Sequence, residues 1–135
     1  MTLGFEKFGL GSAAVAVLSA CQMQTPEVSQ TATSPVYHGI ETRLLDGDLV
    51  RFILHMEGTK DRQDMLDYAE CAASQYALIR GYGFARHVRT SVTEKAGQWS
   101  GDSVYTVSAD LPKGIQTIDA ETIVANCEET GIPTV

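Results

Sequence analysis

The chain has 135 residues, a length that fits one domain. Its hydrophobic content of 44% and charged content of 20% are typical of a folded globular protein and exclude a disordered one. The formal net charge of −7 argues against the broad basic surface with which proteins neutralise many phosphates. We therefore expect no nucleic-acid partner.

The N-terminus has the pattern of an export signal. Residues 8–20 form an uncharged apolar run, preceded by the positive charge of Lys7. The run is too short to span a bilayer, which takes about 20 residues, but it suits the apolar core of a signal peptide that ends in small side chains. Gly9 and Gly11 would each weaken a buried helix by about 1 kcal/mol. We predict that residues 1–20 are a signal peptide.

The residues Leu18, Ser19, Ala20 and Cys21 that follow resemble the lipobox of bacterial lipoproteins. The resemblance implies cleavage before Cys21, a diacylglyceryl group on its thiol and an acylated (palmitate-bearing) amino terminus. Two or more chains give stable membrane anchoring, whereas one binds reversibly. Gln22 stands where enterobacterial inner-membrane lipoproteins carry aspartate, so the resemblance implies an outer-membrane anchor that faces the periplasm.

A tether is expected between the anchor and the folded domain. Residues 22–36 are rich in Thr, Ser, Gln and Pro and contain no aromatic residue, so they bury too little apolar surface to offset their ordering entropy. Such a segment reaches about 20 Å. We predict a lipidated cysteine and flexible tether over residues 21–36 and a single domain over residues 37–135.

The domain is expected to begin with a strand and a helix. Residues 48–57 alternate between apolar and polar side chains, which predicts a strand with one apolar face. Asp61 can cap a following helix and Gly81 can end it. An apolar stripe with helical spacing runs along this helix through Met65, Ala69, Ala72, Tyr76 and Ile79.

Three further strands are expected after the helix. Residues 84–94 and 99–109 flank a hairpin loop at residues 95–98. Residues 115–127 also alternate, and their β-branched side chains favour a strand over a helix. The predicted fold is therefore α+β, with one amphipathic helix packed on a small, mainly antiparallel sheet in the order β-α-β-β-β.

The three cysteines form an odd set for an oxidising compartment. If lipid occupies Cys21, then Cys71 and Cys127 remain as a pair, and the periplasm permits disulfides. A bond between them would fasten the last strand to the helix. The alternative is two separate buried thiols.

Basic residues concentrate in one segment, where Arg80, Arg86, His87 and Arg89 fall within residues 80–89. These side chains are candidates for a small anion site, because guanidinium groups bind phosphates and carboxylates well. Strand alternation places Arg86 on one face and both His87 and Arg89 on the other, so two or three of them can meet. The alternative is a solvated strand that pairs with surface carboxylates.

No catalytic, metal or cofactor motif is evident. His38, His55 and His87 lack metal-ligand spacing, and no serine lies in a nucleophile-elbow motif. We expect no cofactor and a non-enzymatic protein that binds or scaffolds another envelope component. The alternative is a small envelope-modifying hydrolase that uses His87 and scattered carboxylates. A pocket that holds His87 beside a carboxylate with a perturbed pKa would favour that alternative.

Two stretches carry a wider resemblance: YAECAASQYALIRGYGFARHVRT at residues 68–90 and IDAETIVANCEETGIPTV at residues 118–135. Through them the chain is similar to small lipoproteins of marine and photosynthetic alphaproteobacteria, a family with no assigned activity. The resemblance bears on location and fold and implies no mechanism.

Overall fold

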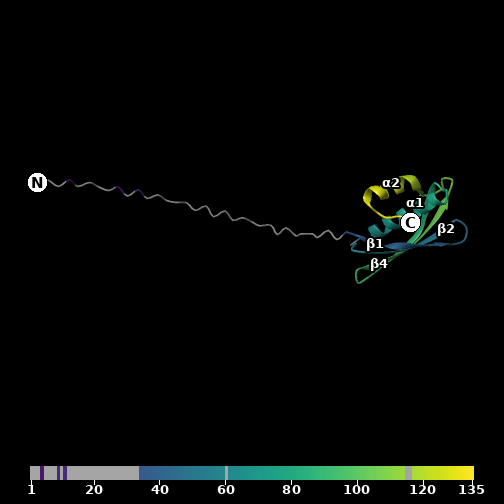
Figure 1. Cartoon of the computed structure of the whole chain (residues 1–135), viewed down its shortest axis with the longest axis horizontal. Coiled ribbons are helices and arrows are strands. Elements are labelled where there is room, and N and C mark those ends of the chain that lie inside the picture. The colour runs from purple at the N-terminus through teal and green to yellow at the C-terminus, as the bar shows by residue number, and fades with distance from the viewer. Residues whose placement is uncertain (1–3, 5–8, 10, 12–33, 60, 115–116) are drawn as a thin grey trace. The chain divides into compact units, whose positions relative to one another are not determined.

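Five antiparallel strands form one sheet in the order β1-β2-β4-β3-β5. The computed structural model describes residues 34–59, 61–114 and 117–135, together with the isolated residues 4, 9 and 11. Along the chain the elements are β1 (Val36–Leu44), β2 (Leu49–Glu57), α1 (Arg62–Ile79), β3 (Phe84–Lys95), β4 (Gln98–Ser108), β5 (Thr117–Asp119) and α2 (Ala120–Thr130). Both helices lie on one side of the sheet (Figure 1).

The core lies between α1 and one face of the sheet. Alternate residues of β2 point into it and are buried, as the period of two predicts: Val50, Phe52, Leu54 and Met56. Gly101 of β4 faces Leu54, and a Cβ atom there would lie 2.6 Å from the sulfur of Met65. The missing side chain therefore lets α1 pack directly against the middle of the sheet.

The main helix begins and ends as predicted. Asp61 is its N-cap, and its carboxylate accepts a hydrogen bond of 2.9 Å from the backbone N–H of Gln63. Arg80 is the C-cap, and Gly81 follows with a φ of 79°. A left-handed residue at this position suits glycine and turns the chain towards β3.

The last predicted strand is wrong over most of its length. Within residues 115–127 the structure has a strand only at Thr117–Asp119, and a helix occupies Ala120–Thr130; residues 115 and 116 lie outside the described part. Asp119 caps this helix by accepting a 2.9 Å hydrogen bond from the N–H of Thr122, and Gly131 ends it with a φ of 73°. The β-branched residues give only a weak preference for a strand. The caps, together with tertiary packing, override that preference.

A first strand, β1, was also missed. It pairs with β2 at the sheet edge, and a bulge interrupts the register between Tyr37 and Gly39. Most of its side chains are exposed; Tyr37 and Ile40 pack against the core. An edge strand exposed on both faces has no clear apolar alternation. The α+β class with a main helix on an antiparallel sheet is confirmed, but β1 and α2 extend the predicted β-α-β-β-β order.

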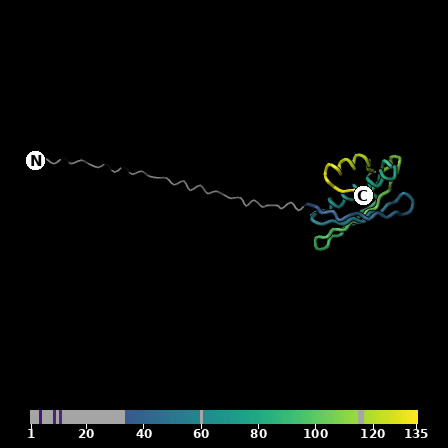
Figure 2. The backbone as a smooth tube through the Cα atoms, in the orientation of Figure 1, coloured from purple at the N-terminus to yellow at the C-terminus, as the bar shows by residue number. Residues whose placement is uncertain are grey.

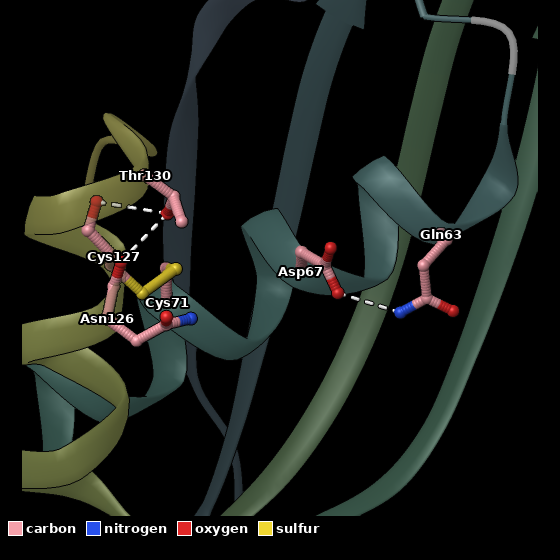
Figure 3. The surroundings of a disulfide bond; sticks show 6 residues. All are labelled: Gln63, Asp67, Cys71, Asn126, Cys127 and Thr130. Carbon is pink, nitrogen blue, oxygen red and sulfur yellow. Dashed lines mark hydrogen bonds between the residues drawn. A yellow bond between two sulfur atoms is a disulfide. The ribbon is translucent and has the colours of Figure 1, made fainter.

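The second helix is linked to the first. Cys71 of α1 and Cys127 of α2 form a disulfide with a Cα–Cα distance of 6.0 Å (Figure 3). The bond therefore joins two helices, not a strand and a helix as the sequence predicted. It closes a loop across a sequence separation of 56 residues, for which the chain-entropy model gives about 4 kcal/mol.

Apart from residues 4, 9 and 11, the predicted signal peptide lies outside the described residues, as do the lipid-attachment residue Cys21 and most of the predicted tether. No helix in the described part of the chain is long and apolar enough to cross a membrane. The tube in Figure 2 traces the folded part from β1 to the C-terminal helix.

Candidate functional sites

A bulge in β3 divides the basic segment between the two faces of the sheet. His87 pairs with Tyr105 of β4, and the next paired residue is Arg89, so Val88 is the extra residue. The inserted residue reverses the alternation. Arg86 and Arg89 therefore share the face away from the helices, whereas His87 points to the helix side. The predicted grouping of His87 with Arg89 is wrong for this reason.

The uncovered face carries a row of arginines from three strands. Arg43 of β1 lies opposite Arg51 of β2, and Arg51 and Arg89 both lie opposite Val104 of β4. Neighbouring strands are about 4.8 Å apart, so these side chains form one line across the sheet. Arg86 lies a short distance along β3. We call Arg43, Arg51, Arg86 and Arg89 the arginine row.

Two carboxylates partly neutralise this row. Asp102 accepts hydrogen bonds from Arg51 at Nε (2.9 Å) and Nη2 (2.5 Å), and it lies 3.6 Å from Arg89. Glu41 pairs with Arg43 at 2.8 Å, a contact that lowers the Glu41 pKa. Within the described residues Arg86 forms no salt bridge. Four guanidinium groups thus face two carboxylates in a protein of net charge −7.

The row remains accessible at its ends. The side chains of Arg43 and Arg89 are 53% and 52% exposed, against 34% for Arg51. Val104 lies beneath the row and is 4% exposed although it points away from the core. The alkyl stems of long cationic side chains can cover such a residue while their charged ends reach solvent. The face therefore combines an apolar floor with accessible positive charge.

The helix-covered side contains a pocket of about 410 Å³ beside α1, which we call the His87 pocket. Its lining comes from α1, β3, β4 and β5 and consists of Gln63, Leu66, Glu70, His87, Tyr105, Thr117 and Ile118. This volume lies within the range of small-molecule sites, roughly 300–1,000 Å³. The helical spacing of Gln63, Leu66 and Glu70 aligns these three side chains on one flank of α1.

Hydrogen bonds hold the His87 ring in place. Its Nε2 lies 2.8 Å from the hydroxyl of Thr90, which in turn shares a 2.5 Å hydrogen bond with the buried hydroxyl of Ser103. The ring also meets Tyr105 edge to face, with centroids 5.1 Å apart. These contacts come from β3 and β4, so the sheet fixes the imidazole before any ligand arrives.

Burial perturbs the acidic groups of this pocket. It raises the pKa of Glu70, and the nearby charge of Asp67 raises that pKa further, whereas His87 opposes the shift. Burial, followed by the charge of Glu70, also raises the pKa of Tyr105, so its phenol stays protonated at neutral pH. In the part of the chain described, Glu70 forms no salt bridge.

Arg80 lies apart from both sites. It caps α1 and lines a smaller hollow of about 130 Å³ together with Tyr76 and Tyr82. The predicted anion set of Arg80, Arg86, His87 and Arg89 is therefore divided among three places. Sequence reasoning missed Arg43, Arg51 and Glu70, since their roles depend on strand register and on the side of α1 that meets β3.

The fold and these two sites define a disulfide-linked α+β domain with a charged open sheet face. The chain belongs to the YNQ4 C-terminal domain family, whose model matches residues 37–131. It is 31% identical over 85 residues to the "Uncharacterized 26.9 kDa protein in nqo8 5′ region" of Paracoccus denitrificans. That alignment covers 63% of this chain and 33% of the relative, so the chain spans about a third of the relative's length. No solved structure matches it.

Proposed function

We propose that this protein is a lipid-anchored, non-catalytic binding module of the bacterial envelope, which recognises a carboxylate- or phosphate-bearing component through the arginine row. The observation that carries the proposal is the excess of guanidinium groups on the uncovered face. Arg43 and Arg51 already hold carboxylates, whereas Arg86 forms no salt bridge within the described residues. Like charges on neighbouring strands destabilise a sheet. A bound anion would offset the positive charge of Arg86 and Arg89.

The chemistry of the row supports an anionic partner. Guanidinium groups form paired hydrogen bonds with carboxylates and phosphates. Arg51 already holds Asp102 in this way, and Arg86 and Arg89 retain donors for a partner. The remaining negative charge of the protein disfavours nonspecific binding to anions elsewhere on its surface.

The anchor half of the proposal rests on the lipobox resemblance at Cys21 and on the cysteine count. Since Cys71 and Cys127 are bonded to each other in the structure, Cys21 is the remaining cysteine of the three. Mass spectrometry of the mature protein tests this directly. We expect an N-terminal acylated, diacylglyceryl cysteine at position 21, and a different mature N-terminus would contradict the anchor. Separation of the two membranes would then test the outer-membrane, periplasm-facing location.

The partner is tested by pull-down from solubilised envelopes with the full chain. The variant Arg86→Glu/Arg89→Glu should recover at least about tenfold less partner, since two losses of roughly 0.7 kcal/mol add to about 1.4 kcal/mol, a tenfold change in affinity. The control Arg80→Glu/Lys95→Glu changes the net charge equally but alters residues outside the row. Equal loss in both variants would contradict a specific role of the row.

A flotation assay separates the two sources of anionic groups. The full chain with Cys21→Ser, which cannot take the anchor lipid, is mixed with vesicles that contain or lack anionic phospholipid. Binding that requires anionic lipid and is lost in Arg86→Glu/Arg89→Glu would identify headgroup phosphates. Partner recovery without vesicle binding would identify protein carboxylates or another anionic polymer. If the chain with an intact row neither bound anionic vesicles nor recovered a partner, the proposed role of the row would be contradicted.

One observation favours a second candidate, a small hydrolase: the His87 pocket holds an imidazole beside Glu70, whose pKa is raised. The hydroxyl of Thr90, 2.8 Å from the His87 ring, is also hydrogen-bonded to buried Ser103, which disfavours its use as a nucleophile. Ester or amide turnover that disappears in both His87→Asn and Glu70→Gln would establish this candidate. Turnover unchanged in either variant would reject it.

A further inference from the structure

The His87 pocket has an electrostatic character opposite to that of the arginine row. Its described lining contains Glu70 and no lysine or arginine. Arg62 donates to the carbonyl oxygen of Thr90 at 3.3 Å and is not part of the lining. With His87 neutral, the formal charge of the described lining is therefore negative.

Negative charge is also concentrated behind the pocket. Asp67 lies on α1 one turn before Glu70, and it accepts a hydrogen bond of 2.7 Å from the amide of Gln63 (Figure 3). Burial raises the pKa of Tyr105 most, and the charges of Glu70 and then Asp67 raise it further, so the charge of both carboxylates reaches the interior of the site. A positively charged ligand would offset the cost of burying the charged carboxylate of Glu70, whereas Glu70 and Asp67 would repel an anion.

The remaining lining suits an apolar cation. Leu66 and Ile118 supply aliphatic surface, and the rings of Tyr105 and His87 meet edge to face within the site. An aromatic face attracts an ammonium group, and the attraction increases when water is excluded. The described lining offers a strongly hydrated metal ion a single carboxylate ligand. An alkylammonium ion can contact that carboxylate, the aromatic rings and the aliphatic side chains at once.

We propose that the His87 pocket binds a small organic cation of the alkylammonium class, held by the Glu70 carboxylate against the rings of Tyr105 and His87. This site is separate from the arginine row and lies on the other side of the sheet. The protein would thus bind an anionic envelope component on its open face and a cationic small molecule beneath α1.

The test is a titration of the isotope-labelled full chain in detergent with three probes of similar shape: tetramethylammonium, neopentyl alcohol and pivalate. Amide shifts in two-dimensional NMR report where each probe binds, with sodium chloride as the control for ionic strength. We expect tetramethylammonium to shift the amides of the lining residues. We expect the neutral and anionic probes to bind at least about tenfold more weakly, because they cannot form an ion pair with Glu70.

Single substitutions identify the carboxylate that holds the cation. Glu70→Gln should weaken tetramethylammonium binding at least about tenfold, because the Coulomb attraction to the carboxylate is lost. Asp67→Asn, which removes a carboxylate outside the lining, should weaken it less. Glu70→Asp keeps the charge and should retain part of the affinity, which separates loss of charge from loss of fold. Equal binding of the three probes, or unchanged binding in Glu70→Gln, would overturn the proposal. Arg86→Glu/Arg89→Glu should bind tetramethylammonium normally, so failure of either proposal leaves the other standing.

Discussion

The two faces of the sheet differ in the side chains they carry: one is apolar and packed against α1, and the other is charged and open to solvent. On the covered face, apolar residues of β2 and β4 pack against α1 so closely that Gly101 must lack a side chain. On the open face, the same strands carry Arg51, Asp102 and the half-exposed Ile53. Because one backbone supports both faces, changes to alternate residues should affect stability on one side and binding on the other.

The largest effect is expected from the disulfide that holds the covered side together. Replacing both Cys71 and Cys127 by alanine should lower the free energy of unfolding by about 4 kcal/mol, because the unfolded chain regains the freedom of a long loop. Urea unfolding of the full chain with and without reductant measures this. If the variant and the reduced wild type were both as stable as the oxidised protein, the link between α1 and α2 would carry no stability.

Gly101→Ala tests the close packing of α1 on β4. The new methyl group would meet the sulfur of buried Met65, so the variant should lose about 1–3 kcal/mol of stability. Thr106→Ala, on the open face of the same strand, should change stability by no more than about 0.5 kcal/mol. Equal losses at the two positions in chemical denaturation would contradict the difference between the faces.

Ser74→Ala should stabilise the protein. The hydroxyl of Ser74 is fully buried in α1 and, within the described residues, has no hydrogen-bond partner. Removing an unsatisfied buried hydroxyl should raise the free energy of unfolding by about 1 kcal/mol. A lower thermal unfolding midpoint for the alanine variant would show that the hydroxyl is satisfied in solution.

Glu70→Gln should raise the unfolding temperature in a pH-dependent way. Burial raises the pKa of Glu70 in the folded state, so folding favours its protonated form, and stability falls as pH rises through the unfolded and then the folded pKa. Glutamine resembles the protonated side chain at every pH. The variant should therefore be more stable than wild type at pH 7 and equal to it below both pKa values. An equal gain in stability at acidic pH would indicate that glutamine stabilises the protein through better packing and not through removal of the buried charge.

The main helix and three strands could be predicted because their signals are local. Asp61 and Gly81 mark the ends of α1, and period-two alternation marks β2. Edge strand β1 lacked that alternation because most of its side chains are exposed and a bulge interrupts it between Tyr37 and Gly39. The β-branched residues of α2 resembled a strand, and only its caps at Asp119 and Gly131 indicate a helix.

The candidate sites were less predictable because they depend on register. Val88 has no feature that distinguishes a bulged residue, yet its insertion places Arg89 on the face of Arg86 and not on that of His87. Arg43 and Arg51 join them only through pairing of β1 with β2. Sequence spacing shows where basic residues concentrate, but it does not show which cross-strand neighbours complete the row.

The most direct test of the central claim compares partner recovery by three full-length chains: wild type, Arg86→Glu/Arg89→Glu and Arg80→Glu/Lys95→Glu. The proposed role of the arginine row predicts that the first variant recovers at least about tenfold less anionic partner, while the second, with the same net charge, recovers as much as wild type. Equal recovery by all three chains, or equal loss in both variants, would contradict it.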